Sequence, residues 1–104
     1  MRVFVSAVAT AVLALGSGAV FADGEAAMNK AGCMACHAKD KKLVGPSFKD
    51  IAAKYKGQDA SAKLFDKVRK GGGGVFGPIP MSPNGPDKIA DPDLKDAIAV
   101  ILKS

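Results

Sequence analysis

Hydrophobic positions divide the chain into one long apolar segment at the N-terminus and four later segments whose apolar residues recur three or four positions apart. That spacing places the apolar side chains on one face of an α-helix. The four segments fall within residues 23–37, 47–57, 59–71 and 91–104. The pattern therefore predicts an all-α domain of about four helices, with the last helix packed across the first.

Capping residues predict where these helices begin and end. Four short polar residues are expected to serve as N-caps, because their side chains can accept hydrogen bonds from the free N–H groups of a first turn: Asp23, Ser47, Asp59 and Asp91. Gly57 and Gly71–Gly74 are expected to end the second and third helices. Gly32 has no side chain, so it is expected to allow the close approach of another helix. The apolar face of the third helix leaves Arg69, with Lys63 and Lys67, on the outside.

A long segment between the third and fourth helices, Val75–Ala90, lacks helical spacing. It contains four prolines, which exclude a helix or a central strand. A loop of this length in so small a domain is usually functional or disordered. The segment is therefore a candidate for carrying a functional residue.

Residues 1–22 have the pattern of a secretory signal. Arg2 is their one charged residue, an apolar core follows, and Val20 and Ala22 fit the positions before a signal-peptidase cut. Cleavage after Ala19 is a second option, and an uncleaved membrane anchor is the alternative interpretation, because the uncharged stretch is nearly long enough to span a bilayer. The small residues of Gly16–Ala19 favour cleavage. We expect a periplasmic mature chain comprising residues 23–104.

The mature chain is short and poor in aromatic residues. It has 82 residues, no Trp and one Tyr, and two of the five Phe lie in the signal. Domains of this size bury a small fraction of their surface and often need a covalent or metal staple. We therefore expect a bound group to complete the core.

Cys33-Met34-Ala35-Cys36-His37 combines two thiols three positions apart with an imidazole directly after them. This is the pattern of a c-type haem attachment site. Each thiol can form a thioether with one haem vinyl group, and His37 can ligate the iron. A thioredoxin-like motif would need a βαβ context, a zinc site normally needs four ligands although the chain has 2 Cys and 1 His, and a simple disulfide leaves the imidazole unexplained. The motif predicts one covalently bound haem c.

Met81 is the predicted second axial ligand of the iron. Met1 leaves with the signal, Met34 lies within the attachment turn, and Met28 is on the helix that leads to His37, where it is expected to fill the core. Met81 lies in the proline-rich loop, which is long enough to reach the opposite haem face. Methionine sulfur favours ferrous iron and raises the reduction potential. The alternative is a methionine that is merely buried in the loop.

Two further residues are candidate partners of these ligands. The imidazole N–H that does not face the iron needs an acceptor, for which the carbonyl of Pro46 is the candidate. Asn84 could donate its amide to the sulfur of Met81 or cap the loop. Its alternative role is ordinary turn chemistry with Gly85.

The formal charge of +5 becomes +4 once Arg2 is removed. After export, nucleic acid is an unexpected partner, and a basic rim would steer the protein toward acidic protein partners. The candidate docking residues are Lys30, Lys39, Lys41, Lys42 and Lys70. The alternative is a lysine-rich surface that is only solvated.

With these residues in place, the chain resembles small bacterial class I cytochromes c of the 551 type, the cytochrome c8 family. The resemblance covers essentially all of Asp23–Ser104 and is carried by Gly32–His37, Val44–Pro46, Asp50–Tyr55 and Gly77–Met81. It implies about four helices around haem c, with His37 proximal, Met81 distal, and Pro46 and Asn84 as their partners. It also implies a periplasmic role in carrying single electrons.

The chain departs from this family at two positions. Phe76 stands where members commonly have a Trp whose N–H helps to hold a haem propionate, and Val100 stands where the last helix often carries another Trp. Neither change affects the iron ligands. Phe76 and Ile79 are expected to pack in the haem pocket.

The leading functional hypothesis is a monomeric electron shuttle that contacts membranes only through its partners. Those partners would be redox proteins with acidic docking surfaces: a nitrite reductase, a terminal oxidase, a cytochrome bc complex or a reaction centre. A haem enzyme or gas-binding protein with an open sixth iron position is the alternative, and a haem-free disulfide domain is a third. Electron shuttles that serve these different partners resemble one another in sequence and fold.

Overall fold

The computed structural model describes residues 18–104, with side chains from Asp23 onward, so the predicted signal at residues 1–22 lies mostly outside the described part. This part forms four α-helices and one 3₁₀ turn: α1 (Gly18–Ala31), η1 (Cys33–Ala35), α2 (Phe48–Lys54), α3 (Ser61–Lys70) and α4 (Asp91–Leu102). Within residues 18–104, the extended pairing is limited to one isolated bridge. None of these helices has the length and apolar character needed to cross a membrane.

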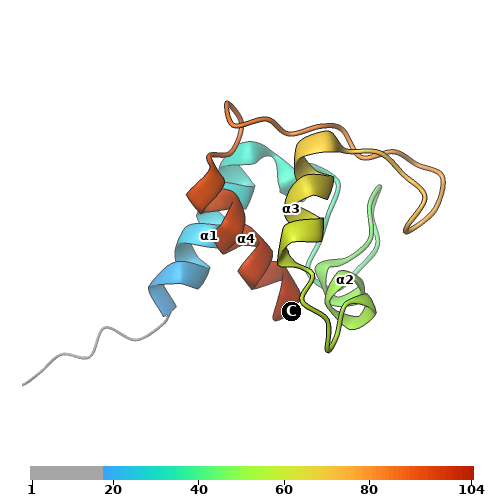
Figure 1. Cartoon of the computed structure of the whole chain (residues 1–104), viewed down its shortest axis with the longest axis horizontal. Helices are drawn as coiled ribbons and strands as arrows, with labels where there is room; N and C mark the ends of the chain where they lie inside the picture. Colours follow the sequence, from blue (N-terminus) through green and yellow to red (C-terminus); the bar gives the residue numbers. More distant parts are fainter. Residues whose placement is uncertain (1–17) are drawn as a thin grey trace, which may run out of the picture.

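Helix α4 is the centre of the fold, because it packs against α1, α2 and α3. Its residues Leu94 and Ile98 are fully buried, and Figure 1 shows α4 crossing α1. The predicted packing of the last helix across the first is confirmed. Met28 of α1 joins the same buried cluster, as expected.

The glycine that permits the α1–α4 contact is Gly24, which the sequence pattern did not single out. A Cβ there would lie 2.8 Å from both the carbonyl oxygen of Asp96 and a methyl group of Val100. The expectation that Gly32 serves this purpose is wrong, since a Cβ at Gly32 would meet nothing within 4 Å. Gly32 instead has a φ of 83°, a left-handed conformation that glycine adopts without strain and that turns the chain from α1 into η1.

Of the predicted N-caps, Ser47 is confirmed, because its Oγ accepts a hydrogen bond from the N–H of Asp50 at 3.0 Å. The predictions for the other three caps are wrong. Helix α1 begins upstream of Asp23. Helix α3 has Ala60, which is buried, as its N-cap in place of Asp59, and it has no side-chain cap hydrogen bond. Asp91 is the first residue of α4 rather than its N-cap, and its carboxylate pairs with an arginine of α3.

The segment between α3 and α4 is non-helical, as predicted, but it has a defined backbone path. Gly71 ends α3, and Gly72 and Met81 then exchange two backbone hydrogen bonds of 2.9 and 3.0 Å. A turn closes this hairpin through a 2.8 Å hydrogen bond from Gly74 to Gly77. The loop then passes over α3 to reach the start of α4 (Figure 1). The hairpin thus brings Met81 back beside the end of α3.

Candidate haem site

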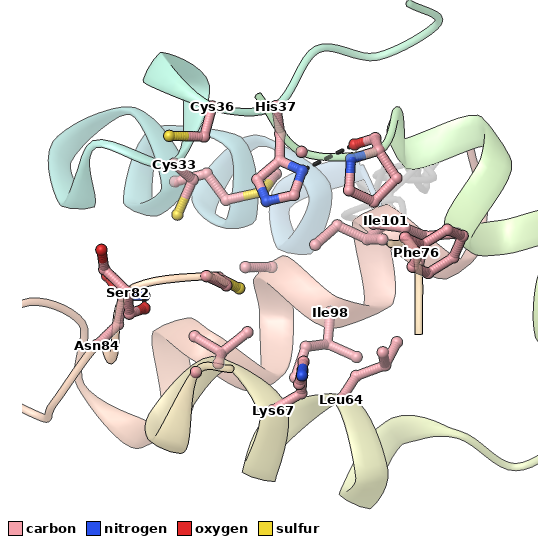
Figure 2. Close-up of a pocket in the computed structure, with 18 of the residues that line it drawn as sticks. Cys33, Cys36, His37, Leu64, Lys67, Phe76, Ser82, Asn84, Ile98 and Ile101 are labelled. Atoms are coloured by element: carbon pink, nitrogen blue, oxygen red, sulfur yellow. Dashed lines mark hydrogen bonds between the residues drawn. The ribbon is translucent and has the colours of Figure 1, made fainter. Parts of the chain in front are cut away.

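A cavity of about 670 Å³ lies between η1, α3, α4 and the loop. Protein interiors contain few voids larger than a water molecule, whereas pockets for small ligands and cofactors are about 300–1,000 Å³. Cys33, Cys36, His37 and Met81 all line this cavity. Figure 2 shows the cysteines and His37 on one side and Leu64 and Lys67 of α3 on the opposite side. The cavity therefore brings the predicted attachment and ligand residues together.

The two thiols differ in their surroundings. They are not joined in a disulfide, and Cys36 is exposed whereas Cys33 is half-buried. Burial raises the pKa of the Cys33 thiol, so the protonated form predominates at neutral pH. Both thiols border the cavity, an arrangement that would allow two thioether bonds to one group.

His37 is held by a hydrogen bond and by a stacked ring. Its Nδ1 lies 2.8 Å from the carbonyl oxygen of Pro46, so the predicted hydrogen bond is present. The imidazole also stacks on Phe48, with ring centroids 5.5 Å apart. With Nδ1 donating to a carbonyl, Nε2 keeps the lone pair that a metal ligand needs.

Gly45 is a site residue that the sequence interpretation missed. A Cβ at this position would lie 2.5 Å from Cε1 of His37, so only glycine leaves room for the imidazole. The N–H of Gly45 also donates to the carbonyl of Cys36 at 2.8 Å and closes the loop behind the histidine. The resemblance includes Gly45, but residue spacing does not indicate that its backbone lies against the imidazole ring.

Met81 is partly buried and borders the cavity, and Ser82 and Asn84 follow it at one end of the view in Figure 2. The amide of Asn84 donates to the carbonyl of Ser82 at 2.9 Å, a contact within the loop, whereas the alternative role had named Gly85. Donation from Asn84 to the Met81 sulfur stays a prediction. The backbone N–H of Asn84 also donates to Val68 of α3 at 2.9 Å, which attaches the loop to that helix.

The expectation that Arg69 lies on the outside of α3 is wrong, because its side chain is only 14% exposed. Its guanidinium donates to the carbonyls of Asn84 and Ile89 at 3.1 and 2.7 Å, and to the carboxylate of Asp91 at 2.5 Å. Helical spacing identifies the face of a residue but not the distant carbonyls beside it. Sequence reasoning therefore missed this contact.

The mouth of the cavity is apolar. Phe76 and Ile79 border it, and their packing against a bound haem stays a prediction. Val44 and Val75 are exposed beside the same opening. Lys54 lies over the Phe76 ring, with its Nζ 5.7 Å from the centroid.

The five predicted docking lysines are all exposed, but most of them do not border the cavity. Among the five, only Lys70 borders the cavity; Lys30, Lys39, Lys41 and Lys42 do not. Three lysines that were not proposed do border it: Lys63, Lys67 and Lys88. The chain positions of lysines do not reveal which of them surround an opening formed by several elements.

The residues present fit a covalently bound haem. Two thiols can form thioethers, a buried imidazole has one nitrogen free to ligate, and a thioether sulfur is available from a separate segment. Apolar side chains form most of the surrounding wall. This donor set suits haem iron with histidine and methionine axial ligands.

Comparison with known proteins agrees with this chemistry. The family model described as "Cytochrome c" matches residues 21–104. Cytochrome c2 of Rubrivivax gelatinosus is 51% identical over 76 residues, which cover 72% of this chain and 89% of the relative. Cytochrome c-551 of Pseudomonas aeruginosa is 50% identical over 80 residues, 76% of each chain.

A solved structure shares the fold. The crystal structure of wild-type Nitrosomonas europaea cytochrome c552 superposes with a TM-score of 0.69 at 42% identity, and the match covers 76% of this chain and 96% of that one. The fold, the attachment motif and these relatives lead to one conclusion. The chain belongs to the cytochrome c family, as a small class I cytochrome c of the c-551 type that carries one covalently bound haem c and transfers electrons.

Proposed function

We propose that residues 23–104 form a periplasmic single-electron carrier whose haem c is attached to Cys33 and Cys36 and ligated by His37 and Met81. One observation carries the proposal: Cys33 in η1, Cys36 and His37 directly after it, and Met81 in the loop after α3 all border a single cavity. Haem iron supplies the Fe(II)/Fe(III) couple when it is bound. The role of the chain is to hold both ligands in place.

The two ligands are held by different contacts. His37 is fixed by its hydrogen bond to Pro46 and by stacking on Phe48. Met81 is held through the backbone pair with Gly72. Ligands that stay in place in both oxidation states keep structural rearrangement small when the electron moves.

The partners follow from the rim of the cavity. An apolar opening bordered by lysines suits docking to redox proteins with acidic surfaces, because opposite charges steer the encounter. We infer that such partners are a nitrite reductase, a terminal oxidase, a cytochrome bc complex or a photosynthetic reaction centre. We infer that the signal is cleaved after Ala22 and that the carrier acts as a monomer. N-terminal sequencing of the periplasmic protein would test the cleavage site.

The ligand proposal is tested by the optical spectrum of the purified holoprotein and of Met81→Ala. We expect a c-type reduced spectrum and a weak near-infrared Met–Fe(III) charge-transfer band that is lost in the variant. A high-spin ferric spectrum that readily binds added ligands in the wild type would instead indicate an open sixth position. The haem-enzyme or gas-binding hypothesis would then replace the electron carrier.

The docking proposal is tested by two double variants that each remove two positive charges. Lys70→Gln/Lys88→Gln changes the rim, whereas Lys41→Gln/Lys42→Gln changes exposed lysines that do not border the cavity. We expect the rim variant to slow electron transfer to an acidic redox partner at low salt several-fold more than the other variant. Equal effects of the two would show that overall charge, not the rim, guides docking.

A further inference from the structure

Arg69 connects three parts of the chain through one side chain. From the last turn of α3, its Nη1 donates to the carbonyls of Asn84 and Ile89, and its Nη2 donates to Asp91 in the first turn of α4. The guanidinium also lies over the Phe65 ring, 5.0 Å from its centroid. The side chain is largely buried, so water competes weakly for these hydrogen bonds.

The loop is attached at Met81 and again just after it. The backbone of Met81 itself pairs with Gly72, which belongs to a run of four glycines, the least stiff backbone a chain can have. On its C-terminal side, the backbone of Asn84 is bound twice: its N–H to Val68 and its carbonyl to Arg69. Only two residues, 82 and 83, separate this attachment from Met81, and residue 83 is a proline with a fixed φ.

We propose that Arg69 is a positioning residue for the distal ligand: by fixing the loop at Asn84 and Ile89, it holds the Met81 sulfur at the haem iron. The inference rests on the proposed ligation by Met81. Without the guanidinium, the two carbonyls lose a charged donor and residues 82–89 gain freedom. The bound position of Met81 then becomes less populated, and an added ligand competes for the iron more successfully.

The prediction concerns the shape of the side chain as well as its charge. A planar guanidinium can bond three acceptors at once, whereas an ammonium on a flexible stem cannot bridge them in the same way. Arg69→Lys should therefore hold Met81 in place better than Arg69→Met does, but less well than the wild-type arginine. Lys95→Met is the matched control, because Lys95 is exposed on α4 and the change removes one positive charge in the same way.

The experiment measures imidazole binding to the ferric holoproteins, together with the near-infrared Met–Fe(III) band. We expect the apparent imidazole Kd to fall about tenfold in Arg69→Met, by less in Arg69→Lys and not at all in Lys95→Met. The near-infrared Met–Fe(III) band should weaken most in Arg69→Met, less in Arg69→Lys and not at all in Lys95→Met. The unfolding free energy is measured in parallel, because a purely structural role would lower it without changing imidazole affinity.

The outcomes separate this inference from the ligand proposal. If Met81→Ala differs from wild type in band and imidazole affinity but Arg69→Met does not, the positioning role is overturned while ligation by Met81 stands. If wild type and Met81→Ala behave alike, ligation by Met81 fails. Should Arg69→Met yield no holoprotein, Arg69→Lys decides: tighter imidazole binding than wild type supports the role, and unchanged binding overturns it.

Discussion

The two walls of the haem cavity are built in different ways. The proximal wall around His37 is closed by contacts between neighbours in the sequence, such as the hydrogen bond to Pro46 nine residues away. The distal loop shares one contact of that range, the backbone pair of Gly72 and Met81, but it also depends on contacts from further along the chain, with the Arg69–Asp91 pair spanning 22 residues. Local contacts form with little loss of chain entropy, whereas distant ones require the helices to be packed first.

Exposure follows the same division. His37 and Phe48 are buried, whereas four residues of the loop are exposed although they do not border the cavity: Gly72, Gly74, Gly77 and Pro78. A segment with few buried contacts opens at lower free energy than the core. We therefore expect ligand exchange to begin on the distal side and the proximal side to change only when the domain unfolds. The following variants test this difference, beginning with the largest expected effect.

Gly71→Ala should disturb the distal wall most. Gly71 has φ 70° and ψ −153°, a region nearly restricted to glycine, and a Cβ would meet the carbonyl oxygen of Met81. Backbone strain and overlap each cost about 1–3 kcal/mol of unfolding free energy, and we expect loss of the near-infrared Met–Fe(III) band. Denaturant titration and the optical spectrum measure both.

Gly57→Ala is the control for this prediction. Gly57 also has a positive φ, 78°, but a Cβ there would meet nothing within 4 Å. It should lower the unfolding free energy through strain alone and leave the band intact. If the two variants lose equal stability and both keep the band, the contact with Met81 has no role in holding the loop.

Gly45→Ala should disturb the proximal wall. The new Cβ would overlap the His37 imidazole, which must tilt away from Pro46 or move against Phe48. Overpacking of this kind costs about 1–3 kcal/mol of unfolding free energy. Because the Pro46 hydrogen bond sets the basicity of the histidine, the reduction potential should shift as well. Unchanged stability and potential, measured by denaturation and voltammetry, would contradict the assigned fit.

Ser47→Ala should have the smallest effect. It removes the Oγ that caps α2 through the N–H of Asp50 and should lower the unfolding free energy by about 1 kcal/mol. Imidazole affinity should stay at the wild-type value, because no contact with the distal loop is lost. A change in imidazole affinity would show that the proximal and distal walls are coupled through α2.

Local patterns predicted the elements that local contacts form. The attachment motif, the acceptor at Pro46, the cap at Ser47 and the non-helical loop could be identified because each depends on residues close together in the sequence. Two of the aspartates predicted as caps do not cap a helix: α3 begins after the buried Ala60, and Asp91 lies inside α4, where its carboxylate pairs with Arg69.

The sequence by itself therefore determined the helical class, the chemistry of the two thiols, the imidazole and the methionine, and the haem that this chemistry suits. Only the tertiary structure decided the roles of two glycines: Gly24 allows α4 to approach α1, and Gly45 leaves room for the His37 imidazole. It also decided which lysines border the cavity and that Arg69 binds the distal loop. The reason is physical. Residue spacing fixes the face of a helix on which a side chain lies, but its partner on that face is set by how distant segments pack.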